Sequence, residues 1–230
     1  MTKNKQQEDI LEETGKQLGN TIHQFEDFFE EHKNKILTTL VVVLVAVLGF
    51  VGYKKFIQGP KENDAITSMY KAQYYFEQDS FKIALNGDGA NIGFQTIVDN
   101  YGSTKAGNLA QYYIGVCQYK LGKYQESITA LEDFKCADPL LLGRKFEIIA
   151  DANMELNKVD VGIENYKKSA ENVKGNELLE PMVLSKLAIA AYVNKKPEIA
   201  KEAFEQLKNN YPNTPEGNDA VKYLIILENS

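Results

Sequence analysis

The pattern of hydrophobic and polar positions divides the chain into three stretches. Residues 36–53, which read ILTTLVVVLVAVLGFVGY, contain no charged side chain. As a helix with a rise of about 1.5 Å per residue, this run would cover roughly 27 Å, close to the hydrocarbon thickness of a bilayer. Lys54 and Lys55 can snorkel to the interface, which extends the apolar stretch to residue 57. The pattern therefore predicts a transmembrane helix over residues 36–57.

A cleaved signal peptide is the main alternative for this run. The apolar part of a signal peptide begins near the N-terminus and is followed by a small-residue cleavage site. Here a tail of residues 1–35 with eight acidic side chains comes first, so we expect an uncleaved anchor. Lysines flank the run on both sides, and the positive-inside rule does not decide its orientation. We expect the short tail to stay in the cytoplasm.

The 1–35 tail carries apolar residues at helical spacing. The members of this stripe are Leu11, Leu18, Ile22, Phe25 and Phe29. Their spacing predicts an amphipathic helix, which Gly15 and Gly19 weaken. The tail has five lysines against eight acids, and an acidic segment binds anionic membrane surfaces poorly. The stripe is a candidate interface for a protein partner or for a homo-oligomeric coiled coil.

Behind the anchor, residues 58–230 repeat a helical-hairpin pattern. The clearest unit is residues 108–139, in which Gly115 and Ser127 stand where two helices would cross closely. Gly122 permits the tight turn between these helices. The spacings resemble the tetratricopeptide repeat, a pair of antiparallel helices about 34 residues long.

Further units follow with weaker similarity. Asn157 and Pro197 mark the expected turns of the next two hairpins. A second internal echo relates residues 94–110 to residues 204–220, which share Phe, Tyr, Thr, Gly, Asn and Ala at an offset of 110. The echo implies a divergent first helix pair, whose turn we expect to have grown into LNGDGAN, residues 85–91.

The last apolar-periodic stretch is residues 215–228, with Pro215 at a suitable first helical position. It is expected to be the capping helix that a solenoid needs at its end. The predicted fold is therefore all-α: an amphipathic tail over residues 1–35, a transmembrane helix over residues 36–57, and a tetratricopeptide-like solenoid over residues 58–230.

Composition and motifs give little sign of chemistry. Both histidines, His23 and His32, lie in the tail, and no cluster of ligating side chains has metal-binding spacing. The tail and the rest of the chain each carry a net charge of −3, since 5 − 8 and 21 − 24 both give −3; neither half has the basic character of a nucleic-acid binder. We expect no enzyme activity, cofactor or metal, and we expect Cys117 and Cys136 to be separate thiols.

Tyrosines crowd two of the expected helices. They are Tyr70 and Tyr74 on the first soluble helix, and Tyr112, Tyr113 and Tyr119 on the next. Packing between helices is one explanation. The other is a groove lined by tyrosines that bind partner side chains, because Tyr is enriched at interfaces.

The whole layout resembles the YfgM-like family, ancillary proteins of bacterial inner membranes. The local match is FFEE at residues 28–31 before Lys33 and Lys35 at the membrane entry, followed by a glycine-containing span and a helix-rich domain. The resemblance implies a cytoplasmic N-terminus and a periplasmic C-terminal domain. It also implies association with the SecYEG translocon and with periplasmic chaperones, and no active site.

Two other functions remain open at this point. One is an envelope-assembly or cell-division scaffold that uses the repeat groove and does not need its tail. The other is a regulator whose cytoplasmic tail alone sequesters a signalling factor. All three functions are non-enzymatic, and they differ in which segment of the chain binds the partner.

Overall fold

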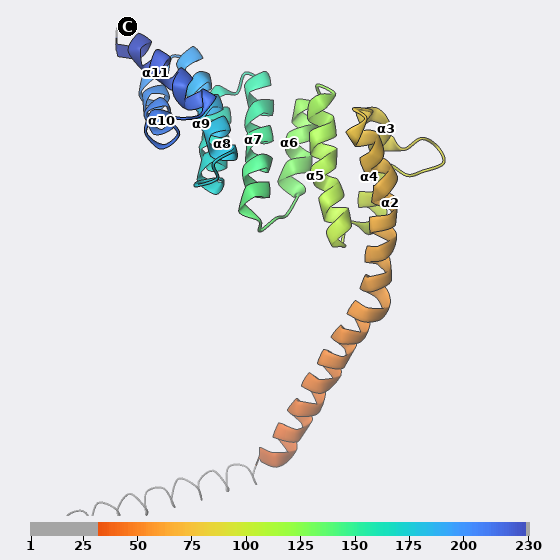
Figure 1. The fold of residues 1–230 in the computed structure, drawn as a ribbon. Coiled ribbons are helices and arrows are strands. Elements are labelled where there is room, and N and C mark those ends of the chain that lie inside the picture. Colours follow the sequence, from red (N-terminus) through yellow and green to blue (C-terminus); the bar gives the residue numbers. More distant parts are fainter. Residues whose placement is uncertain (1–31, 229–230) are drawn as a thin grey trace, which may run out of the picture. The chain divides into compact units, whose positions relative to one another are not determined.

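The computed structural model describes residues 32–228 (Figure 1). The chain divides into two compact units, Met1–Gly59 and Pro60–Ser230. The candidate tail interface at Leu11, Leu18, Ile22, Phe25 and Phe29 lies outside the described residues. All regular structure within residues 32–228 is helical, as the sequence predicts.

The apolar run forms a helix. Over the described residues, one helix, His32–Glu77, is long and apolar enough to cross a membrane by length and composition, with a mean hydropathy of 2.6 in its most apolar window. None of that window is buried inside the protein. Thr38 and Thr39 donate their hydroxyls to the carbonyls of Asn34 and Lys35, at 2.7 and 2.8 Å, so the two polar side chains of the run are satisfied within the helix.

A short π-helical turn, η1 (Lys54–Gln58), follows the apolar run, and the hairpin region begins with α2. The helices of this region stack side by side in chain order (Figure 1). They are α2 (Gly59–Glu77), α3 (Phe81–Asn86), α4 (Phe94–Tyr101), α5 (Lys105–Lys120), α6 (Tyr124–Asp133), α7 (Pro139–Glu155), α8 (Val159–Asn172), α9 (Leu179–Val193), α10 (Pro197–Asn210) and α11 (Pro215–Glu228). The hairpins are α2 with α3–α4, α5 with α6, α7 with α8, and α9 with α10, and α11 packs on α10.

The same turn closes each of the four hairpins within residues 32–228. Each turn has one residue with a positive φ. In chain order these residues are Asp79, Gly122, Asn157 and Lys195. In the second hairpin, the N–H of Gly122 donates to Tyr119 O at 3.0 Å and the N–H of Lys123 donates to Gln118 O at 2.9 Å. Bonds of the same two kinds recur in the other three turns, which is the Schellman ending of a helix. The turns predicted at Gly122 and Asn157 are present, whereas Pro197 is the first residue of α10.

The expected position of the first turn is wrong. The first hairpin turns at Asp79, and residues 87–93, which include GDGAN, separate α3 from α4. Asp88 organises this loop: its carboxylate accepts from the N–H groups of Ala90 and Asn91 at 2.8 and 2.6 Å, and from the Tyr75 hydroxyl at 2.7 Å. The Tyr75 bond and then the Asn91 bonds hold the pKa of Asp88 well below its usual value. The hydrogen bond between Tyr75 and Asp88 thus connects the loop to α2, and the sequence pattern did not predict it.

The sequence similarity between residues 94–110 and 204–220 corresponds to a similarity in structure. We call residues 94–113 the first link and residues 204–223 the second link. In the first link the rings of Phe94 and Tyr113 stack at 4.8 Å and 8°. In the second, Phe204 and Tyr223 stack at 4.8 Å and 4°. Each link therefore joins the end of one hairpin to the next helix by the same aromatic pair.

Both links also have the same kind of helix cap. Thr104 accepts from the N–H of Gly107 at 2.9 Å, and Thr214 accepts from the N–H of Gly217 at 3.1 Å. A Cβ at either glycine would lie 1.9 Å from a tyrosine carbonyl oxygen. Threonine caps a helix in this way, and glycine is needed because the backbone approaches too closely for any side chain.

Small residues bring the helices of a hairpin together. Ser127 on α6 donates its hydroxyl to the carbonyl of Gly115 on α5 at 2.7 Å, and Ser169 on α8 does the same to Gly143 on α7 at 2.7 Å. A Cβ at Gly115 would lie 2.4 Å from Cγ of Leu131. The close crossing predicted for Gly115 and Ser127 is present.

One contact joins the first and second hairpins near the start of α2. The carboxylate of Glu62 accepts from the N–H groups of Lys105 and Ala106 at 2.7 and 2.8 Å. These groups open α5 and have no partner within their own helix. A negative charge at this end is also favoured by the helix dipole. Glu62 therefore caps α5 from a different helix.

Candidate protein-binding surface

The first helices of neighbouring hairpins lie on the inner side of the solenoid. α5 contacts α7, and α9 contacts α11. In contrast, a groove of about 470 Å³ separates α6 from α8 and a second of about 260 Å³ lies between α8 and α10. We call the exposed surface of α5, α7 and α9 the inner face.

A cluster of charges lies at the middle of the inner face. Glu147 on α7 is only 3% exposed. The ammonium of Lys186 on α9 lies 2.7 Å from Glu147 Oε1 and 2.7 Å from Asp151 Oδ2. Arg144 binds the other oxygen of Glu147, and the Tyr166 hydroxyl donates to Asp151. We call these five residues of α7, α8 and α9 the charge cluster.

Contacts within the charge cluster shift the pKa values of Lys186 and Tyr166. Burial alone lowers the pKa of Lys186, but the hydrogen bonds to Asp151 and Glu147 outweigh it and raise the pKa. Burial, and then the charge of Asp151, raises the pKa of Tyr166, so this hydroxyl stays a donor. The side chains of Arg144 and Lys186 are 41% and 39% exposed. The cluster thus stabilises the third and fourth hairpins and presents two cations at the surface.

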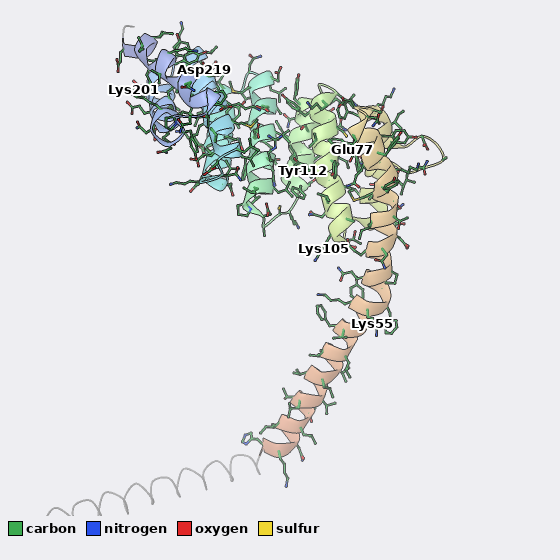
Figure 2. All side chains as sticks on the ribbon, viewed as in Figure 1. Lys55, Glu77, Lys105, Tyr112, Lys201 and Asp219 are labelled. Carbon is green, nitrogen blue, oxygen red and sulfur yellow. The ribbon has the colours of Figure 1, made fainter. Side chains whose placement is uncertain are left out.

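Two of the tyrosines predicted as binding residues lie beside this cluster. Tyr112, labelled in Figure 2, packs on Phe134 with ring centres 5.4 Å apart and lies close to Arg144. Burial raises the pKa of its hydroxyl. Tyr119 packs on Tyr124 at 5.6 Å and is half-buried. The inner face therefore joins two aromatic side chains of α5 to the cations of α7 and α9.

Tyr113 has a different environment. Its ring stacks on Phe94, meets Phe76 edge-on at 5.0 Å, and its hydroxyl accepts from Gln73 Nε2 at 3.3 Å. These contacts connect α5 to α2 and α4. Packing between helices therefore accounts for Tyr113, which is partly buried against the core of the first link.

Tyr70 and Tyr74 lie on the first hairpin, whereas the charge cluster is built by the third and fourth. Both side chains are exposed on α2. The ammonium of Lys71 lies 5.7 Å from the centre of the Tyr74 ring, a cation–π contact. Ile66 is exposed one turn before Tyr70, so these residues form a separate exposed stripe with a spacing of four.

Sequence reasoning missed an apolar stripe on α9 and the charge cluster. The stripe consists of Met182, Ile189 and Val193, all exposed at spacings of seven and four. Exposed apolar stripes of this kind mark interaction surfaces. Its helical spacing could have been found in the sequence, but α9 is apolar nearly all round, which hides the exposed side.

Comparison with known proteins agrees with the fold. A model of the tetratricopeptide repeat matches residues 109–135 and 183–214, which fall on the hairpins α5–α6 and α9–α10. A crystal structure of a Podosopora anserina protein, described as a kinesin light chain with nearly identical TPR-like repeats, superposes with a TM-score of 0.55. It is 14% identical, and the match covers 72% of this chain and 85% of that one. No curated protein sequence matches the chain.

These findings define the class of protein. The chain carries a tetratricopeptide-like helical domain. Such repeats are typically non-catalytic scaffolds for protein–protein interaction, because stacked hairpins offer an extended surface without a reaction centre. No group of three or more potential metal-ligating side chains occurs within residues 32–228.

Proposed function

We propose that this protein is a membrane-anchored interaction scaffold that links the Sec translocon to periplasmic chaperones during protein export. The observation that carries the proposal is the order of parts: a helix of membrane-spanning length and composition, followed directly by tetratricopeptide-like hairpins. The resemblance to the YfgM-like family supplies the partners.

The proposed location is the bacterial inner membrane, with the N-terminus in the cytoplasm and the hairpins in the periplasm. The exposed apolar side chains of the helix would be covered by lipid. Its two threonines are already hydrogen-bonded within the helix, which lowers the cost of placing them there.

In this proposal the inner face binds the chaperone. The α9 stripe would bury apolar side chains of the partner, and Tyr112 and Tyr119 would add amphipathic contact area. The exposed portions of Arg144 and Lys186 would pair with carboxylates at the edge of the interface. Affinity would depend mainly on the apolar stripe, because exposed charges set association rate and orientation more than affinity.

The experiment is a mild-detergent pull-down of the full-length protein, read by mass spectrometry. Two variants accompany it: one lacking residues 1–30, and the inner-face pair Ile189→Ser and Val193→Ser. Ile83→Ser on α3 is the matched control, because Ile83 and Ile189 are 39% and 40% exposed. We expect the wild type to recover Sec subunits and periplasmic chaperones, the truncation to lose Sec, and the inner-face variant to lose chaperones.

Recovery of cell-division or outer-membrane factors without Sec would overturn the proposal in favour of an envelope scaffold. Recovery of partners by residues 1–30 alone would instead support a regulator that acts through its tail. Equal loss from the inner-face variant and from Ile83→Ser would show that the inner face is not the binding surface.

A further inference from the structure

A third groove of the solenoid, between α4 and α6, is lined by glutamines. It has a volume of about 320 Å³ and runs from α4 across α5 to α6. The glutamines are Gln95, Gln111, Gln118 and Gln125, which belong to three different helices. Residues 60–230 contain only seven glutamines, so more than half of them gather at this one groove.

The chemistry of this groove differs from that of the others. Only Glu126 among its eight lining residues is charged, whereas acids and lysines line both the α6–α8 and the α8–α10 grooves. Its apolar floor includes Ile114 and Ala130, both buried. A surface of this kind has a single charge, at Glu126, and offers several amide groups above an apolar base.

One of these amides lacks a partner. The side-chain oxygen Oε1 of Gln118 is buried and is the sole buried side-chain N or O atom within residues 32–228 that has no hydrogen bond. An unpaired buried acceptor is costly, so it gains free energy from any donor that reaches it. Rotation about the last side-chain bond is soft, which lets this oxygen turn toward a ligand in the groove.

The side-chain amide of Gln125, which also lines the groove, has a fixed orientation. Gln125 accepts a hydrogen bond from the ammonium of Lys158 at its Oε1, at 3.0 Å. This contact uses the oxygen of Gln125 and leaves its NH₂ group as the donor. The groove therefore combines an acceptor that needs a donor with a donor whose own oxygen is engaged.

We propose that this glutamine-lined groove binds the main chain of an extended polypeptide. A peptide backbone alternates N–H donors with C=O acceptors and carries no charge, which matches a groove lined mainly by amide side chains. The volume of about 320 Å³ lies at the lower end of the range for ligand pockets, so the groove would hold only a short stretch of the chain. Because every sequence has the same main chain, such a site accepts unfolded chains of many sequences. The inference goes beyond the proposed function, since it needs neither Sec nor a chaperone.

The test uses full-length protein in mild detergent and a fluorescein-labelled, uncharged twelve-residue peptide of Ser, Thr and Ala. Its twin carries N-methyl groups on alternate residues, which removes N–H donors. We expect fluorescence anisotropy to show binding of the first peptide and binding at least tenfold weaker for the twin. Raising the salt concentration should leave the affinity unchanged, because screening acts on charges.

The variant Gln118→Leu separates a binding role from a structural one. We expect it to weaken peptide binding about three- to tenfold, which corresponds to the loss of one hydrogen bond. Its thermal midpoint should stay equal or rise, because an unpaired buried acceptor has been removed. Gln206→Leu on α10 is the matched control and should change neither property.

Several outcomes would overturn the proposal. They are no binding of the unmethylated peptide, equal binding of the twin, and unchanged affinity in Gln118→Leu. A lower thermal midpoint in Gln118→Leu would instead make Gln118 a structural residue. None of these results bears on recovery of Sec or chaperones in the pull-down, so the two proposals fail independently.

Discussion

The two links of the solenoid have the same construction but different surroundings. In the first link, α5 continues past the cap to Gly115, where α6 crosses it and Ser127 donates to the Gly115 carbonyl. In the second link, the corresponding position on α11 is Ile225, which is 56% exposed. Both links contain the aromatic pair and the threonine cap. Gly115 has no glycine counterpart on α11, because it is needed only where α6 crosses α5.

This difference shows which residues the repeat needs for which purpose. The elements common to both links are Phe, Thr and Gly at the junction between hairpins, and they hold the next helix in place wherever it lies in the array. A small residue on that helix is required only if a partner helix approaches closely. Substitutions at corresponding positions of the two links can therefore separate the two requirements.

The largest expected effect is the loss of the stacked ring. Phe94→Ala and Phe204→Ala should each lower the free energy of unfolding by about 3–5 kcal/mol, because both rings are fully buried and little can fill the cavity. Chemical denaturation in detergent, followed by the near-ultraviolet signal of the tyrosines, measures the change. If Phe204→Ala leaves global unfolding intact and only speeds hydrogen exchange in α11, the second link opens locally and the two are not equivalent.

A methyl group at the crossing should have the next largest effect. Gly115→Ala places a Cβ 2.4 Å from Cγ of Leu131, and overpacking of this kind costs about 1–3 kcal/mol. The corresponding change on α11, Ile225→Ala, should stay within roughly 0.5 kcal/mol because the side chain is more than half exposed. Thermal unfolding of both variants checks the contrast. Equal destabilisation would show that Ile225 is also part of a tight contact.

The smallest expected effect concerns the tyrosine before each cap. Tyr211 donates its hydroxyl to the buried carboxylate of Glu180 at 2.5 Å. Tyr211→Phe should cost about 1 kcal/mol at pH 8, the net contribution of a hydrogen bond. Tyr101→Phe is the control, because Tyr101 binds Thr104 through its carbonyl and not its hydroxyl. Urea unfolding of the two variants measures both changes, and equal losses would contradict the assignment.

The same bond predicts a dependence on pH. Burial, and then the bond to Glu180, raises the pKa of Tyr211 to about 12, from an ordinary value of 10.0. A raised pKa means that the unfolded chain loses the proton first, so the stabilisation is complete below pH 10 and is lost as the pH rises through 12. The difference between the wild type and Tyr211→Phe should therefore shrink above pH 10. If the difference in unfolding free energy between the wild type and Tyr211→Phe stays constant from pH 8 to 12, the predicted pH dependence is wrong.

The sequence predicts the hairpins well because their signals are local. Gly122 and Asn157 stand at turns that require a positive φ, and glycine and asparagine adopt it most readily. Asp79 and Lys195 occupy the same position in the other turns. Lysine is not a turn signal, so only the structure reveals that all four turns have the same conformation. The first turn was predicted in the wrong place.

The candidate binding surfaces were harder to predict, since they are made by residues far apart in the chain. Glu147 and Lys186 meet because α7 and α9 are neighbours, and nothing within either helix marks the pair. Tyr112 and Tyr113 are adjacent in sequence and both partly buried, yet Tyr113 packs toward Phe94 of the first hairpin and Tyr112 toward Phe134 after the second. Which side of a helix faces its neighbours depends on the whole stack, which a single segment does not encode.

The cap that Glu62 places on α5 also has a mechanical consequence. The two bonds from one carboxylate to consecutive N–H groups connect α2 directly to the start of α5. Tension that enters α2 from its N-terminal side reaches Glu62 before the apolar contacts of Ala65 and Met69. The load is thus shared with the second hairpin from the outset, and the first hairpin is protected from being peeled away alone.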